Sequence, residues 1–187
     1  MATTQQQSNT FKSTVGGITV SGRAHPLSAW FVLALRLMMG YAFFYAGWEK
    51  VTAAGGWSAS GYLLNAVPEA SPLYDTFLWM GSTAWFADFL AIAVPFGELA
   101  IGLGLLLGVM TRLAAFFGAF MMLMFYFSNW SVEHGLINGD FAYMLVFLAV
   151  AAFGAGRIIG LDPLIERYEI RGEALIERYP ILDYVLG

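Results

Sequence analysis

Long apolar stretches dominate this chain, and short polar segments separate them. About 20 apolar residues at 1.5 Å per residue cross the roughly 30 Å of hydrocarbon in a bilayer. The third stretch, LAAFFGAFMMLMFYFSNW, lacks the polar outer face that a helix of a soluble bundle presents to water. The pattern therefore predicts an all-α integral membrane bundle of four spanning helices, over residues 27–47, 85–109, 113–130 and 141–159.

The basic residues predict how this bundle is oriented. Short cytoplasmic segments retain Lys and Arg, whereas segments on the other side contain few of them. Of the nine basic residues, Arg36 lies inside the first span and Lys50 follows that span. The other seven share one side if the N-terminus is cytoplasmic: Lys12, Arg23, Arg112, Arg157, Arg167, Arg171 and Arg178. We therefore expect a multi-pass protein of the cell membrane with both termini in the cytoplasm.

The segments outside the spans differ in character. Residues 1–26 are polar and lack the apolar core of a secretory signal, so we expect a mobile cytoplasmic tail. Only Met110, Thr111 and Arg112 join spans two and three, which makes these spans adjacent and antiparallel. The connection over residues 51–84 is too apolar for a free loop, and it predicts one or two short helices that cap the extracytoplasmic side.

The C-terminal segment, residues 161–187, contains an exact repeat. LIERY occurs at 164–168 and again at 175–179. Eleven residues make about three helical turns, so the two copies would share one face of a continuous helix, although Gly172 favours a break. The segment is predicted to be an amphipathic cytoplasmic tail. It either lies at the membrane surface or docks a partner, such as a soluble or membrane-bound oxidoreductase subunit.

Two charged residues fall near the middle of predicted spans, where a charge is costly and needs a partner or water. Each lies near the centre of its span, so Arg36 and Glu98 would lie at similar depth and we expect them to pair. We also expect Pro95 to free backbone carbonyls that accept from Arg36. The pair is either a structural lock or the polar floor of a pocket for a headgroup or quinone-like carbonyl ligand. Other polar residues predicted near the pocket or around its mouth are Lys50, Asp88, Asn138, Asp140 and His134.

Glycines recur at spacings that allow helices to approach closely. Arg36, Gly40, Phe43, Gly47 and Lys50 follow one stripe of the first span. Small residues four apart are typical of contacts between membrane helices. We expect helix packing at these glycines: Gly40, Gly47, Gly102, Gly104, Gly108, Gly156 and Gly160.

Composition limits the chemistry that the chain can support. Apolar residues make up 59% and charged residues 12%, far from the roughly 25% charged residues of soluble domains. The absence of cysteine excludes thiolate metal sites and iron–sulfur clusters, and the two histidines, His25 and His134, lie near span ends, where they cannot serve as axial haem ligands. No metal-ligand spacing or nucleotide-binding loop is present, and nothing in the sequence suggests a nucleic-acid partner.

Two segments together resemble the DoxX/DoxD family: RLMMGYAFFYAGWEK at 36–50 and GELAIGLGLLLGVMTRLAA at 97–115. The resemblance covers about residues 27–160. The positions that match the shared pattern are Arg36, Gly40, Gly47, Lys50, Glu98, Gly102, Gly108 and Arg112. Members of this family are small four-helix membrane proteins, some of them similar to a subunit of thiosulfate:quinone oxidoreductase or of a terminal quinol oxidase.

The resemblance implies an accessory or quinone-interacting subunit of a membrane oxidoreductase, without a redox centre of its own. Quinone is the one cofactor that it suggests. A membrane scaffold that recruits a soluble partner is the alternative, and a small-molecule carrier is a third interpretation, for which a chain of this size would have to form a homo-oligomer. The sequence does not decide whether the chain has catalytic activity.

Overall fold

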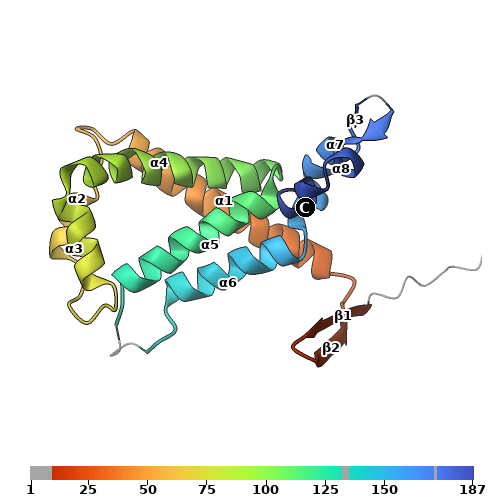
Figure 1. Ribbon diagram of the computed structural model, residues 1–187, viewed down its shortest axis with the longest axis horizontal. Helices are drawn as coiled ribbons and strands as arrows, with labels where there is room; N and C mark the ends of the chain where they lie inside the picture. Colours follow the sequence, from red (N-terminus) through yellow and green to blue (C-terminus); the bar gives the residue numbers. More distant parts are fainter. Residues whose placement is uncertain (1–9, 132–134, 171) are drawn as a thin grey trace, which may run out of the picture.

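The computed structural model describes residues 10–131, 135–170 and 172–187, and its largest feature is a group of four long helices (Figure 1). These helices are α1 (Ser28–Val51), α4 (Ala84–Leu107), α5 (Thr111–Ser128) and α6 (Gly139–Ala152). α1 packs on α4, α4 on α5, α5 on α6, and α6 on α1. Their shared core includes Met39, Phe43, Ile101, Leu105, Met122, Phe147 and Val150.

Three of these helices, α1, α4 and α5, are long and apolar enough to cross a membrane. Their bounds lie close to those predicted, although α1 continues one turn beyond Gly47 to Val51. The fourth predicted span is too long: α6 has 14 residues and ends at Ala152, not at residue 159. Its end follows from Gly154, whose φ of 59° is left-handed, and a short 3₁₀ turn, η1 (Ala155–Arg157), comes next.

Two short helices, α2 (Ser60–Asn65) and α3 (Tyr74–Ser82), occupy the connection between α1 and α4. They pack around a small apolar cluster of their own, formed by Ala59, Leu63, Val67 and Phe77. In Figure 1 they lie across one end of the long helices, which we call the α2–α3 end. The opposite end, called the C-terminal end, holds the start of α1, the α4–α5 turn and the C-terminus.

The C-terminal segment is not one amphipathic helix. The first LIERY copy begins in α7 (Asp162–Glu166) and the second forms α8 (Leu175–Arg178). A small hairpin of β3 (Glu169–Ile170) and β4 (Glu173–Ala174) separates them, and Gly172 has a φ of 84°. A 3₁₀ turn, η2 (Pro180–Tyr184), follows α8, and Leu186 is almost completely buried. The segment is therefore folded back onto the C-terminal end.

The N-terminal segment also contains an element that the sequence did not lead us to expect. Strands β1 (Thr10–Val15) and β2 (Ile18–Arg23) form an antiparallel hairpin. Its turn is Gly16–Gly17, and both glycines have positive φ, which suits a tight two-residue turn. Instead of a uniformly irregular tail, residues 10–23 thus form a defined element that ends four residues before α1.

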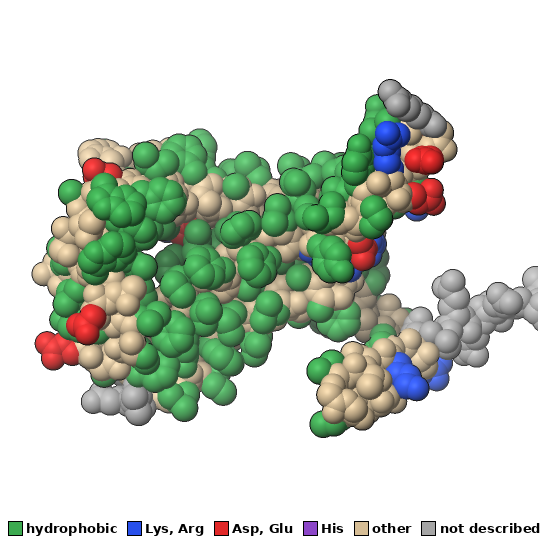
Figure 2. Space-filling model, in the orientation of Figure 1, with side chains coloured by type: hydrophobic (Ala, Val, Ile, Leu, Met, Phe, Trp, Pro, Cys, Tyr) green, Lys and Arg blue, Asp and Glu red, His purple; other side chains and the backbone are tan. Residues whose placement is uncertain are grey.

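The outer surface of the long helices is strongly apolar. Figure 2 shows hydrophobic side chains over most of the visible face of these helices, with charged side chains at the ends. Large side chains such as Phe89, Ile92, Phe116 and Phe120 are each more than half exposed. Exposure of so continuous an apolar surface to water is unfavourable, whereas contact with lipid tails carries no such cost. The chain is a membrane protein.

Candidate functional site

The contact between α1 and α4 is unusually close because glycines line it. A Cβ atom on Gly102 would lie 2.3 Å from the backbone nitrogen of Phe44, and one on Gly47 would lie 2.7 Å from the carbonyl oxygen of Pro95. Gly40 similarly lies against Leu105 and Leu106. Gly104 faces α5 instead of α1, since a Cβ there would lie 3.1 Å from the Cβ of Ala114. The backbones of α1 and α4 therefore touch along about two turns.

This contact fixes the register of α1 against α4. Gly47 lies level with Pro95 and Leu99, so Glu98 lies near the end of α1 that leads to α2. Arg36 precedes Gly47 by eleven residues, a distance of about 16 Å along a helix axis. The predicted Arg36–Glu98 pair is therefore wrong: α1 and α4 are offset along their axes, so the end of α4 is level with Arg36, which lies beside Gly108 instead.

Glu98 forms an ion pair with Lys50 across the α1–α4 contact. Lys50 Nζ donates to both carboxylate oxygens of Glu98, at 2.7 Å each. The Glu98 side chain is only 3% exposed, whereas that of Lys50 is 24% exposed. The Trp57 ring lies 5.8 Å from Lys50 Nζ, which adds a cation–π contact from the loop after α1. The extra turn of α1 beyond Gly47 is what brings Lys50 to Glu98.

The other polar residues predicted near this pocket do not join Lys50 and Glu98. Asp88 is exposed on α4, ten residues before Glu98 and about 15 Å from it along the axis. Asn138 caps α6 by accepting from the backbone nitrogen of Phe141. Asp140 accepts from the side chain of Asn129 at 2.8 Å. His134 lies outside the described residues. The site is thus smaller than expected.

Arg36 is buried at the C-terminal end and takes its partners from the backbone. Its guanidinium donates to the carbonyl oxygens of Ala155, Ile158 and Ile159, at 2.6, 2.9 and 3.0 Å. α4 runs through Pro95 without a break, so the carbonyls expected there do not serve Arg36. They come instead from the turn that follows α6, and Arg36 thereby ties α1 to that turn.

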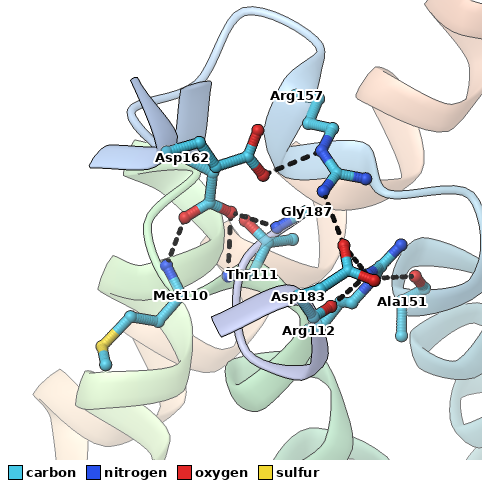
Figure 3. A network of polar contacts seen from close by, with 9 residues as sticks. Met110, Thr111, Arg112, Ala151, Arg157, Asp162, Asp183 and Gly187 are labelled. Carbon is cyan, nitrogen blue, oxygen red and sulfur yellow. Dashed lines mark hydrogen bonds and ion pairs between the residues drawn. The ribbon is translucent and has the colours of Figure 1, made fainter. Parts of the chain in front are cut away.

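Asp162 organises the neighbouring contacts of this end (Figure 3). Its buried carboxylate accepts from the backbone nitrogens of Met110, Thr111 and Gly187, at 2.7, 3.1 and 3.0 Å. Gly156 and Gly160 do not pack helix against helix as predicted: Gly156 lies against Asp162 and Thr111, and Gly160 lies against Arg36 and Gly108. Sequence reasoning missed Asp162, whose only local signal is the Asp-Pro start of a short helix.

Surface ion pairs extend this network outward. Arg157 donates to Asp183 at 2.9 Å and to Glu166 at 2.8 Å, and Arg112 also contacts Asp183 (Figure 3). The hydrogen bond from Arg157 and the nearby charge of Arg112 lower the pKa of Asp183 below its usual value. Because the side chains of Arg157 and Asp183 are open to water, the pairs contribute little stability and serve mainly to position the C-terminal segment.

A comparison with known families identifies the helical region. The sequence model of the DoxX family matches residues 31–131, from α1 to just beyond α5. The chain belongs to the DoxX family. The match includes Arg36, Lys50, Glu98 and the α4–α5 turn, whereas the N-terminal hairpin and Asp162 lie outside it. No curated protein and no solved structure matches the chain.

The N–H donors of Lys50 determine what kind of ligand the Lys50–Glu98 pair of this DoxX protein can bind. An ammonium group has three N–H donors, and two of those of Lys50 are directed at Glu98. Within the described part of the chain, the third has no acceptor. Glu98 neutralises the charge of Lys50, so the remaining donor favours a neutral acceptor over an anion. Across residues 10–131, 135–170 and 172–187, no group of three or more His, Asp or Glu could hold a metal.

Proposed function

We propose that this DoxX protein is an accessory membrane subunit that binds a quinone at Lys50 and Glu98 and has no redox centre of its own. The observation that carries the proposal is that Lys50 Nζ is partly accessible and, among the described residues, donates only to Glu98, which leaves its third N–H for a ligand. A quinone is a neutral apolar molecule whose carbonyl oxygens accept hydrogen bonds, so it matches this donor.

Glu98 would then act on the ligand indirectly, by positioning Lys50. It holds the ammonium in place and keeps the site neutral. A proton that Lys50 gives to a reduced quinone oxygen would be replaced from water, because the Lys50 side chain is 24% exposed. The electrons would come from another subunit, because the chain contains no cysteine and only two histidines. Trp57, beside Lys50, offers an aromatic face on which a quinone ring can stack.

Binding of ubiquinone-1 to the purified protein in nanodiscs tests this proposal. The double variant Lys50→Met with Glu98→Gln removes the donor without leaving an unpaired charge, and it should weaken binding about tenfold or more, as expected for one charge-assisted hydrogen bond. Lys12→Met, in the hairpin, is the matched control and should leave the affinity unchanged. Equal affinity in the double variant would refute the site and favour the scaffold alternative, in which exposed C-terminal residues such as Leu164 and Tyr184 recruit a partner.

We also propose that the chain crosses the membrane four times with both termini in the cytoplasm. α6 is short, but it pairs with α5 over its whole length. Asp140 contacts Asn129 beyond one end of α5, and Gly156 contacts Thr111 at the other. The turn after α6 thus reaches the level at which α5 begins, and the bias of basic residues supports the orientation.

Cysteine labelling tests this topology cleanly because the chain has no cysteine. Ser21→Cys, Ala54→Cys and Glu173→Cys place single thiols at exposed positions before α1, after α1 and after α6. In intact cells, a membrane-impermeant maleimide should label only Ala54→Cys, and the other two should react after lysis. Labelling of Glu173→Cys in intact cells, with Ser21→Cys protected, would mean an odd number of crossings.

A further inference from the structure

The N-terminal hairpin has two faces of opposite character. In its register, Val15 pairs with Ile18, Ser13 with Val20, and Phe11 with Gly22. Side chains of paired residues lie on the same face, and alternate pairs share that face. One face therefore carries Phe11, Val15, Ile18 and Val20. The other carries only polar residues: Thr10, Lys12, Thr14, Thr19, Ser21 and Arg23.

Contacts within the hairpin keep the two faces apart. The Phe11 ring lies over Gly22, where a Cβ would come within 2.6 Å of it, so the ring covers the strand on the apolar side. The hydroxyls of Thr14 and Thr19 lie 2.9 Å apart and form a hydrogen bond across the strands on the polar side. The segregation of side chains is thus a property of the folded hairpin as well as of its sequence.

The apolar face is uncovered. Phe11, Val15, Ile18 and Val20 are 51%, 77%, 72% and 59% exposed. A two-stranded hairpin that stands alone in water is only marginally stable. Exposing four large apolar side chains to water adds a further cost in free energy. The hairpin therefore needs a surface to cover this face.

The surface nearest to the hairpin is the bilayer that contains α1. Only residues 24–27 separate β2 from α1, and four extended residues span at most about 14 Å. The first turn of α1 presents Trp30 and Phe31, which are 63% and 67% exposed and suit the membrane interface. In Figure 2, the hydrophobic side chains of the hairpin lie mainly on its side toward the long helices, and its basic side chains lie on the other side.

Charge selects the kind of lipid. The hairpin carries Lys12 and Arg23, and the first acidic residue anywhere in the chain is Glu49. This N-terminal region is therefore purely cationic where it meets the membrane. Anionic headgroups attract such a segment, with a gain in binding of roughly fivefold for each Lys or Arg near the surface. A second copy of the chain would bring an equally cationic hairpin, which charge repulsion disfavours.

We propose that the β1–β2 hairpin is a membrane-surface anchor, which inserts Phe11, Val15, Ile18 and Val20 into the interface of an anionic leaflet beside α1. Lys12 and Arg23 then extend from the polar face to lipid headgroups. The anchor requires that α1 lie in the membrane, but it is independent of any ligand at Lys50 and Glu98. It fixes the depth and tilt at which α1 enters the bilayer.

Site-directed spin labelling of the full chain in nanodiscs tests the anchor. A nitroxide at Ile18→Cys should be accessible to oxygen and protected from a water-soluble nickel complex, whereas one at Thr19→Cys should show the reverse. The protection at Ile18 should be greater in discs with phosphatidylglycerol than in pure phosphatidylcholine. Lys12→Gln with Arg23→Gln should abolish that difference.

A label at Phe31→Cys reports separately on α1. If it is in lipid while Ile18→Cys and Thr19→Cys are equally exposed to water, α1 is inserted and the anchor is refuted. Spin–spin broadening at Ile18→Cys that disappears on dilution with unlabelled protein would also overturn the proposal, because it would mean that a second copy covers the face. Equal protection of Ile18 in the two lipid mixtures would refute the selection of an anionic leaflet.

Discussion

Glu98→Gln is expected to lower the free energy of unfolding by about 3 kcal/mol, because it leaves the ammonium of Lys50 without a counter-charge. This lies at the low end for a broken buried pair, since the Lys50 side chain is 24% exposed and can recruit some water. Reversible unfolding in mixed micelles, followed by circular dichroism, measures the change.

Two further variants show that the loss comes from an unpaired charge. Lys50→Met with Glu98→Gln removes both charges and should recover more than half of the lost stability. Asp88→Asn changes an exposed carboxylate on the same helix, so it should alter stability by no more than about 0.5 kcal/mol. A double variant that is as unstable as Glu98→Gln would contradict the ion pair between Lys50 and Glu98.

Gly102→Ala is expected to destabilise the protein by about 2–3 kcal/mol, even though alanine favours a helix over glycine by about 1 kcal/mol. The new Cβ would lie 2.3 Å from the nitrogen and 2.6 Å from the Cα of Phe44. These are backbone atoms that cannot rotate away, so α1 and α4 must separate. The same unfolding experiment measures the change.

Gly97→Ala is the matched control for this substitution. It makes the same change on the same helix, but its Cβ meets only the flexible end of Met121, at 3.2 Å. We expect its stability to stay within about 0.5 kcal/mol of that of the unmodified chain. If Gly102→Ala and Gly97→Ala behaved alike, the close contact of α1 with α4 would not hold in the membrane.

The sequence was sufficient for the helices because a bilayer imposes their length and composition. The starts and ends of α1, α4 and α5 fall within a few residues of the apolar stretches. It was not sufficient for their register. Composition reveals that Arg36 and Glu98 are both buried, but only the stagger set by Gly47 and Gly102 decides that Glu98 meets Lys50.

The two ends of the chain were harder to predict for another reason. The hairpin depends on alternation over six-residue strands and a Gly-Gly turn, which are weak signals in a polar segment. The C-terminal fold depends on Asp162, whose partners are as many as 52 residues away in sequence. No local pattern encodes such distant backbone contacts, so the LIERY repeat suggested a helix that the structure divides.

The most direct test of the proposed site is the infrared spectrum of a carbonyl-labelled quinone bound to the protein. With ¹³C at one carbonyl of ubiquinone-1, the proposal predicts that the stretching band of the carbonyl that meets Lys50 shifts to lower frequency, because Lys50 donates a hydrogen bond to it. The shift should persist in Lys12→Met and disappear in the Lys50→Met, Glu98→Gln double variant. An identical shift in that double variant would contradict the assignment of Lys50 as the donor.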